Sequence, residues 1–546
     1  MAADRHPSPP PPPPPPPPQL LAPILRAYLL AFGSTAGPRI ASLILALLPH
    51  SPKHPQNLTI KLWQALKQSA GWNRFPAFCA ILVGGSLALE GPLRSLGHGI
   101  PSNRRLYIRL ATKFLSATVA ANIGFNLLNS EPSAPLPSRD GSAAPKLKGT
   151  GQYGNLRGLD PTEATDAPPA AAANAETFAF EHEDDLSCDF RATVNPSLPP
   201  LPARDVYRAR SLQPLAGKTI DLTLFAAVRA LDICIAPVVA KRRHTAARIV
   251  ANSSNTVLFV LSCYIIMRAW FYAPNRLPRS YNRWISSAAQ LDPRLLLALR
   301  HARYGHFRYG IETGIGPLLG TMCRDYGLPY EWGNPAKTIP IPCELVHQGV
   351  GPSCEHHFAH RFAKAWLFAA KMYVPLQLLM WAQRFAISAR HGTAVKADAL
   401  VKALREGARS SAFLAAFISL FYYGVCLGRT RLGPRVFSSK TVTPQMWDGG
   451  LAVSVGAWLC GWSVLLEKPH RRTEFAFFVL PRALAVVLPR RYERKYLGRE
   501  RLAFVLSAAV IMTAAGEKPE LVRGVFGRVL SGILGTGHKR RPAVEV

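Results

Sequence analysis

Long apolar runs, separated by loops rich in arginine, constrain this chain more than any other feature of its sequence. Basic residues flank the runs, as at Lys241-Arg242-Arg243 and Arg490-Arg491. Lys and Arg at the ends of apolar segments are typical of helices that cross a bilayer, where every backbone polar group must be paired within the segment. The pattern predicts an all-α, polytopic membrane protein.

Eight segments are predicted as membrane spans from their length and apolar character. They are residues 75–93, 110–128, 220–240, 257–272, 362–385, 413–427, 451–466 and 475–488. The apolar stretch 20–48 is interrupted between Gly33 and Pro38, which predicts a kinked helix or two half-helices. Residues 60–67 have an amphipathic pattern typical of a helix at the membrane interface. The stretch 502–515 is short, so it is predicted as re-entrant, interfacial or a packed cap.

The net charge of +33 raises the question of a nucleic-acid partner. The basic residues flank apolar runs and do not form a stripe with interleaved aromatic residues, so nucleic acid is not expected. Membrane lipids are the expected partners, because anionic headgroups attract basic residues that border a span. Other organelle membrane proteins are further candidates.

These segments divide the chain into two membrane modules joined by a connector at the membrane surface. The first module occupies residues 20–130, and 216–275 hold its end and a connecting span. The second module occupies 362–500. Low apolar content predicts disorder in the Pro-rich tail 1–19 and the acidic insert 131–215. The connector is 276–361, and a C-terminal cap with a basic tail fills 501–546.

The two modules resemble each other in sequence, which predicts a tandem duplication. Phe75 to Phe78 aligns with Ser410 to Phe413. In the next span, Ala117, Ala120 and Gly124 share their spacing with Ser454, Ala457 and Gly461. In the third, residues 221–231 align with 474–484. Both copies therefore have their three spans in the same order, and the matching basic ends favour one orientation for both.

Three polar residues fall inside the predicted third spans. Arg229 and Arg482 occupy equivalent positions, and Asp232 lies one helical turn after Arg229. An arginine in an apolar span is costly, so it is expected to face the bundle interior, an aqueous groove or an acid, with Asp232 as the partner of Arg229. The alternative is that both arginines extend to the interface.

The connector holds the densest group of reactive side chains. Cys343, His347 and Cys354 are followed by His356, His357 and His360. Cys343, His347, Cys354 and His357 form the predicted metal site, because two thiolates and two imidazoles suit tetrahedral zinc. A disulfide between Cys343 and Cys354, or simple packing of a reduced turn, remains an alternative. No other cofactor is predicted.

Beyond these residues, the chain resembles the transmembrane protein 135 family. The resemblance rests on Cys343, His347, Pro352-Ser353-Cys354 and the segment 371–376, Lys-Met-Tyr-Val-Pro-Leu, which opens a span. The repeated three-span units resemble the translocase-like, Tim-type modules of that family and its fungal relatives. The resemblance implies a multi-pass protein of peroxisomal or mitochondrial membranes, with a role in organelle dynamics and lipid homeostasis and no established enzymatic activity.

Catalytic motifs give little support to an enzyme. The sequence has no Gly-x-Ser-x-Gly, His-Glu-x-x-His, P-loop or dinucleotide-binding motif. We therefore expect a non-enzymatic role in membrane and lipid homeostasis. A translocase-like pore or import component is the first alternative, and a metal-dependent membrane enzyme is the second.

Overall fold

The computed structural model describes residues 18–45, 58–95, 105–130, 216–241, 245–390 and 398–536. Within these ranges the chain is helical with no strands, and the β pairing is an isolated bridge between Ala216 and Tyr492. The all-α fold class is confirmed. The predicted insert 131–215, the Pro-rich tail before residue 18 and the basic tail after residue 536 lie outside the described residues.

Four helical segments in the described part of the chain are long and apolar enough to cross a membrane. They are Leu62–Ser95, Ser253–Tyr272, Asp398–Val436 and Pro444–Leu466. Each contains one predicted span. The other four predicted spans also form helices, but each of these includes several charged residues: α4 (Arg105–Leu128), α7 (Ile220–Lys241), α13 (Cys354–Arg390) and α18 (Pro469–Val487).

The first apolar stretch is one continuous helix, α1 (Pro18–Leu45), not two half-helices. Pro23 and Pro38 both lie inside it. The Ser34 and Thr35 hydroxyls donate to the Ala31 carbonyl, so polar groups near the expected break are paired along the helix itself.

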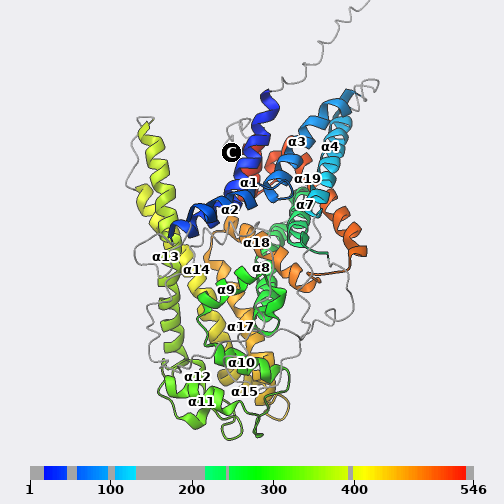
Figure 1. Cartoon of the computed structure of the whole chain (residues 1–546). Coiled ribbons are helices and arrows are strands. Elements are labelled where there is room, and N and C mark those ends of the chain that lie inside the picture. Colours follow the sequence, from blue (N-terminus) through cyan, green and yellow to red (C-terminus); the bar gives the residue numbers. More distant parts are fainter. Residues whose placement is uncertain are drawn as a thin grey trace, which may run out of the picture.

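The first of two groups of helices contains α1 and packs around a core of its own. In space, α1 packs on α3 (Phe75–Ser95), α3 on α4, α4 on α19 (Leu497–Glu517), and α19 on α7 (Figure 1). The Phe504 ring of α19 lies 5.8 Å from Phe78 and 5.5 Å from Phe125. The amphipathic helix α2 (Leu58–Ala70) lies against α1 and α3 and exposes Ile60 and Trp63. The C-terminal helix α20 (Gly524–Leu534) covers this group near α1 and α19.

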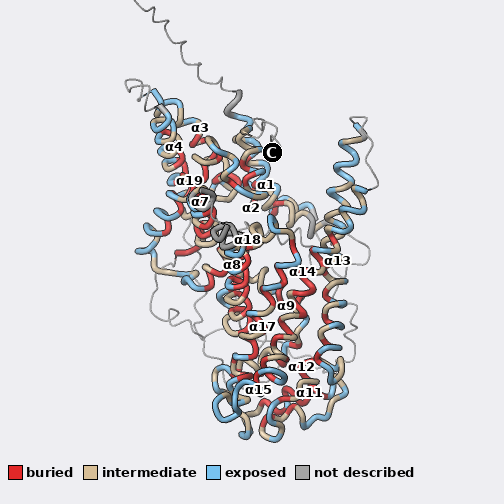
Figure 2. The backbone as a smooth tube through the Cα atoms, turned by 180° about the vertical axis from the view of Figure 1, so that it is seen from behind, coloured by how far each residue is buried: buried red, intermediate tan, exposed pale blue. Residues whose placement is uncertain are grey.

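A second group has the same order of neighbours. Helix α13 packs on α14 (Asp398–Cys426), α14 on α17 (Ala452–Cys460), α17 on α8 (Thr245–Tyr272), and α8 on α18. The Phe259 ring of α8 lies 6.0 Å from Phe413 of α14 within its core. Figure 2 shows buried residues along α8, α14 and α17, whereas the free end of the α13–α14 hairpin is largely exposed.

The two groups exchange one helix with each other. Helix α8 follows α7 along the chain but packs in the second group, and α19 follows α18 but packs in the first. Residues 259–267 of α8 and 504–512 of α19 also match: both begin Phe-Val-Leu-Ser and end Ile-Met. The repeat therefore includes a fourth helix. The exchange is reciprocal and the equivalent helices α7 and α18 contact each other, as expected of halves related by an approximate two-fold axis.

The connector forms a separate small core at the far end of the second group (Figure 1). The helices of this core are α10 (Pro293–Arg303), α11 (Gly316–Asp325) and α12 (Cys343–Val346). The first connector helix, α9 (Arg279–Ala289), contributes its buried residues to the core of the second group. Leu295, Phe307, Leu319 and Leu345 are among the fully buried side chains of the connector core. This core holds α12 beside the start of α13, where the Cys/His residues lie.

Candidate metal centre

Four metal-ligating side chains converge where the connector meets α13 and α14. Cys343, His347, Cys354 and Cys426 place one ligand atom each within 4.8 Å of all the others. The Cys343 Sγ lies 3.8 Å from both Cys354 Sγ and Cys426 Sγ. The His347 Nε2 lies 3.4 Å from Cys343 Sγ and 3.5 Å from Cys426 Sγ. This Cys3His group could hold a metal ion.

Local geometry explains three of the four positions. Cys343 is the first residue of α12 and His347 follows the end of that helix, so the two side chains lie one turn apart on the same face. The chain then turns back through Gly349 and Gly351, both at positive φ, the latter at 110°. Cys354 begins α13, where the helix dipole favours a thiolate.

The fourth position comes from a distant part of the chain. Cys426 is the last residue of α14, which packs beside α13 so that its end meets the start of α13. His347, Cys354 and Cys426 are all buried, and Cys343 is partly exposed. The group is thus closed by protein on most sides.

A hydrogen bond fixes which nitrogen of His347 faces the sulfurs. Its Nδ1 lies 2.7 Å from the Gly351 carbonyl oxygen, to which it can only donate. The proton on Nδ1 leaves the Nε2 lone pair directed at the cysteines. Metal-ligating histidines commonly have this arrangement, with the second nitrogen bound to a carbonyl.

The charge environment favours an ionised thiol at the partly exposed position. Hydrogen bonding from the Cys426 thiol lowers the pKa of the Cys343 thiol well below its usual value, although burial opposes the shift. The Arg429 guanidinium adds to the effect. Burial raises the pKa of Cys354. Thiolates are the metal-binding form of cysteine, so Cys343 is prepared for a cation.

His357, the predicted fourth ligand, lies beside this group but outside it. Its ring centroid is 4.5 Å from that of His347. The Nε2 of His357 accepts a hydrogen bond from Arg361 Nε at 3.0 Å, which occupies the lone pair that a metal would need. Cys426 takes the fourth place instead. His356 contacts the Val350 carbonyl oxygen through Nδ1, also away from the sulfurs.

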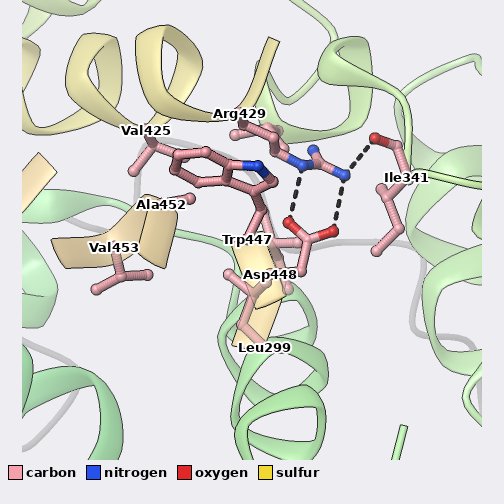
Figure 3. Close-up of a pocket in the computed structure, with 10 residues that line it drawn as sticks. Leu299, Ile341, Val425, Arg429, Trp447, Asp448, Ala452 and Val453 are labelled. Carbon is pink, nitrogen blue, oxygen red and sulfur yellow. Dashed lines mark hydrogen bonds and ion pairs between the residues drawn. The ribbon is translucent and has the colours of Figure 1, made fainter. Parts of the chain in front are cut away.

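A buried ion pair supports the chain just before Cys343 (Figure 3). Arg429, in the π-helical turn Leu427–Arg431 after Cys426, contacts the Asp448 carboxylate at 2.8 and 3.0 Å. It also donates to the Ile341 carbonyl, and Tyr309 accepts from the Ile341 amide at 3.0 Å. These contacts connect the segment that leads into Cys343 with the helix end that carries Cys426.

The predicted intramembrane residues lie elsewhere, where α7 meets α18 and α20. Arg229 is 8% exposed, and its guanidinium lies over the rings of Phe225, Phe477 and Phe526. Asp232, its expected partner, is bound by Arg523.

Arg482 differs from its equivalent Arg229. It donates to the Phe478 carbonyl at 2.6 Å and lies over the Phe478 ring, one turn back in its own helix. Both arginines therefore stack on the residue four positions earlier, Phe225 or Phe478, in agreement with the predicted repeat alignment.

Cys426 is the member of the Cys3His group that the sequence did not predict. It lies singly in an apolar run, where cysteine is interpreted as a small hydrophobic residue. Only its place at the end of a span that precedes the basic pair Arg429 and Arg431 sets it apart from Cys460 or Cys263.

Comparison with known proteins yields no relative. No family model, curated protein or solved structure matches this chain.

Proposed function

We propose that Cys343, His347, Cys354 and Cys426 bind a structural Zn²⁺ ion that fastens the connector to the second group of membrane helices. The distances between the ligand atoms carry the proposal. In a tetrahedral site with Zn–S near 2.3 Å and Zn–N near 2.05 Å, sulfurs lie about 3.8 Å apart and nitrogen lies about 3.5 Å from sulfur. Four of the six separations between the ligand atoms, 3.4 to 3.8 Å, match these values, and all six are within 4.8 Å.

The ligand set favours zinc and a structural role. Three thiolates and one imidazole are a usual set for structural zinc, and soft thiolate ligands select against Mg²⁺ and Ca²⁺. Four protein ligands fill a tetrahedral shell, so no coordination position is left for a substrate. The same geometry argues against a disulfide between Cys343 and Cys354, because the Cys343 Sγ lies equally far, 3.8 Å, from Cys354 Sγ and from Cys426 Sγ.

Elemental analysis of the purified full-length protein tests the proposal. We expect one zinc per chain in the wild type and its loss in Cys426→Ser. Cys460→Ser is the matched control: Cys460 also ends a buried helix, but its thiol donates to the Ala457 carbonyl of that helix. Zinc-free wild-type protein, or equal zinc in both variants, would exclude the site.

We propose further that the protein acts in peroxisomal or mitochondrial membranes, in membrane and lipid homeostasis. Support comes from the helices that can cross a membrane and from the resemblance of Cys343, His347 and Pro352-Ser353-Cys354 to the transmembrane protein 135 family. Organelle fractionation combined with lipidomics of a deletion strain tests this role. Unchanged organelles and lipids would remove it.

The translocase-like alternative rests on the repeated helical units. It predicts import subunits that co-purify with the protein, together with a hydrated path between the two helix groups. A metal-dependent enzyme would require an open coordination position, for which the closed Cys3His set provides no support.

A further inference from the structure

Arg229 is a buried charge whose closest described contacts are aromatic rings. The side chain is 8% exposed, and its Nε has no hydrogen-bond acceptor. The nearest acid in sequence, Asp232, binds Arg523, whose Nε and Nη2 both donate to the carboxylate. A guanidinium group carries five N–H donors, and burying them unpaired is costly.

The charges around Arg229 do not balance. Glu474 is the second acid near it, and its carboxylate lies 4.0 Å from Arg528. Three guanidinium groups, from Arg229, Arg523 and Arg528, thus surround two carboxylates. One positive charge is left over, and it belongs to the most buried of the three arginines.

Three aromatic rings lie against the Arg229 guanidinium. The Phe225, Phe477 and Phe526 centroids lie 5.5, 5.1 and 5.8 Å from the guanidinium carbon. Such contacts hold the cation in place without accepting a conventional hydrogen bond, and the Nε–H of Arg229 has no acceptor.

We propose that Arg229, together with Arg523, binds a phosphate group. Guanidinium groups bind phosphate oxygens in a bidentate manner. The excess of one positive charge in this cluster of arginines and carboxylates also suits a phosphate ester. The Arg523 side chain is 45% exposed, so the solvent-facing part of the proposed site is at Arg523.

The surroundings favour a lipid as the source of the phosphate. Val525 and Val529 lie one turn apart on α20 and are both exposed, next to Arg528. Exposed apolar side chains beside basic ones suit acyl chains and a headgroup. This inference goes beyond the metal centre and does not depend on it.

The internal repeat provides a matched control. Arg482 is the equivalent of Arg229 in α18 and stacks on Phe478 as Arg229 stacks on Phe225. The guanidinium of Arg482, however, donates to the Phe478 carbonyl. Replacing Arg482 therefore removes a similar buried charge without removing the proposed site.

The experiment measures binding to the full-length protein in detergent, with three probes: phosphatidic acid, phosphatidylcholine and inorganic phosphate. We expect saturable binding of phosphatidic acid, at least tenfold weaker in Arg229→Met and unchanged in Arg482→Met. The ligand-free stability of Arg229→Met should not fall, because methionine suits a pocket of three phenylalanine rings. If inorganic phosphate binds as well as the lipid with the same dependence on Arg229, the ligand is a small phosphate ester.

A wild-type protein that binds neither phosphatidic acid nor phosphate would overturn the proposal. Equal binding by Arg229→Met and the wild type, or equal loss in both arginine variants, would also overturn it. Should Arg229→Met fail to fold, Asp232→Asn decides the question: it frees Arg523 and adds one net charge, so phosphatidic acid should bind more tightly. Unchanged or weaker binding by a folded Asp232→Asn would then reject the site.

Discussion

At the scale of single residues, the contacts of a side chain decide its role more than its type does. Cys426 and Cys460 both end buried helices of the second group. Cys460 donates its thiol to a carbonyl of its own helix, whereas Cys426 meets Cys343 and His347 from another segment. Only the second environment can provide a tetrahedral metal site.

His357→Gln tests which imidazole binds the metal. We expect this variant to keep its zinc, because His357 Nε2 accepts a hydrogen bond from Arg361 and the Gln side chain can accept it as well. His347→Gln should lose zinc. Metal content of the two purified variants gives the answer, and loss of zinc from His357→Gln alone would restore the ligand set expected from the sequence.

Asp448→Asn tests the buried ion pair behind the site. The Arg429 and Asp448 side chains are each 3% exposed. Removing the carboxylate leaves a buried guanidinium uncompensated, so we expect a loss of about 3–5 kcal/mol in the free energy of unfolding. Equilibrium unfolding of the full chain in mixed detergent micelles measures it.

The control for this variant is Glu331→Gln in the connector. Glu331 forms an exposed pair with Lys337 at 3.4 Å, and exposed pairs contribute little. Its unfolding free energy should stay close to that of the wild type. Similar losses of unfolding free energy in both variants would mean that the buried pair stabilises the fold no more than the exposed pair does.

The metal site could be predicted from sequence only as far as its ligands are neighbours in the chain. Cys343, His347 and Cys354 lie within a short segment, and their thiol and imidazole groups suggested zinc. The fourth ligand depends on how the end of α14 meets the start of α13. No local pattern encodes that contact, so the sequence led to the nearby His357 as the expected fourth ligand.

At the scale of helices, close approach between backbones fixes the α14–α17 pair. A Cβ built on Gly424 would lie 2.7 Å from the Gly456 Cα, and one on Gly456 would lie 2.5 Å from the Phe421 carbonyl oxygen. Small residues let membrane helices pack at such short range. This pair in turn holds Cys426 at the end of α14.

Gly424→Ala should therefore separate the two helices. We expect a loss of about 1–3 kcal/mol in the free energy of unfolding, because backbone atoms rather than a flexible side chain block the new methyl group. Gly91→Ala in α3 is the control, since nothing lies within 4 Å of its added Cβ. Thermal unfolding of both variants measures the difference, and an unaffected Gly424→Ala would contradict the packing.

Helix positions were predictable where helix partners were not. Apolar length located all eight predicted spans within helices. The sequence placed residues 501–546 in a C-terminal cap with a basic tail without naming its neighbours, and α19 packs between α4 and α7. Apolar runs show where a buried helix lies in the sequence, but they do not show which neighbouring helix it packs against.

At the scale of the whole molecule, the exchange of α8 and α19 makes each half depend on the other. The first core contains Phe504, Ala509 and Ile511 of α19, and the second contains Phe259 and Ile266 of α8. Neither group of helices can complete its core from its own half of the chain. The exchange therefore binds the halves together as a swapped segment binds two protomers of a dimer.

Truncation after Tyr496 tests this dependence, because it removes α19 and α20 and leaves every helix of the second group in place. We expect faster hydrogen exchange in α3, α4 and α7, whose buried faces lose Phe504 and its neighbours, while zinc stays bound to the second group. Truncation after residue 536 keeps both helices and should change neither quantity. Unchanged exchange in α4 after the longer truncation would show that the first group is complete without α19, whereas loss of zinc would show that the two groups fold as one cooperative unit.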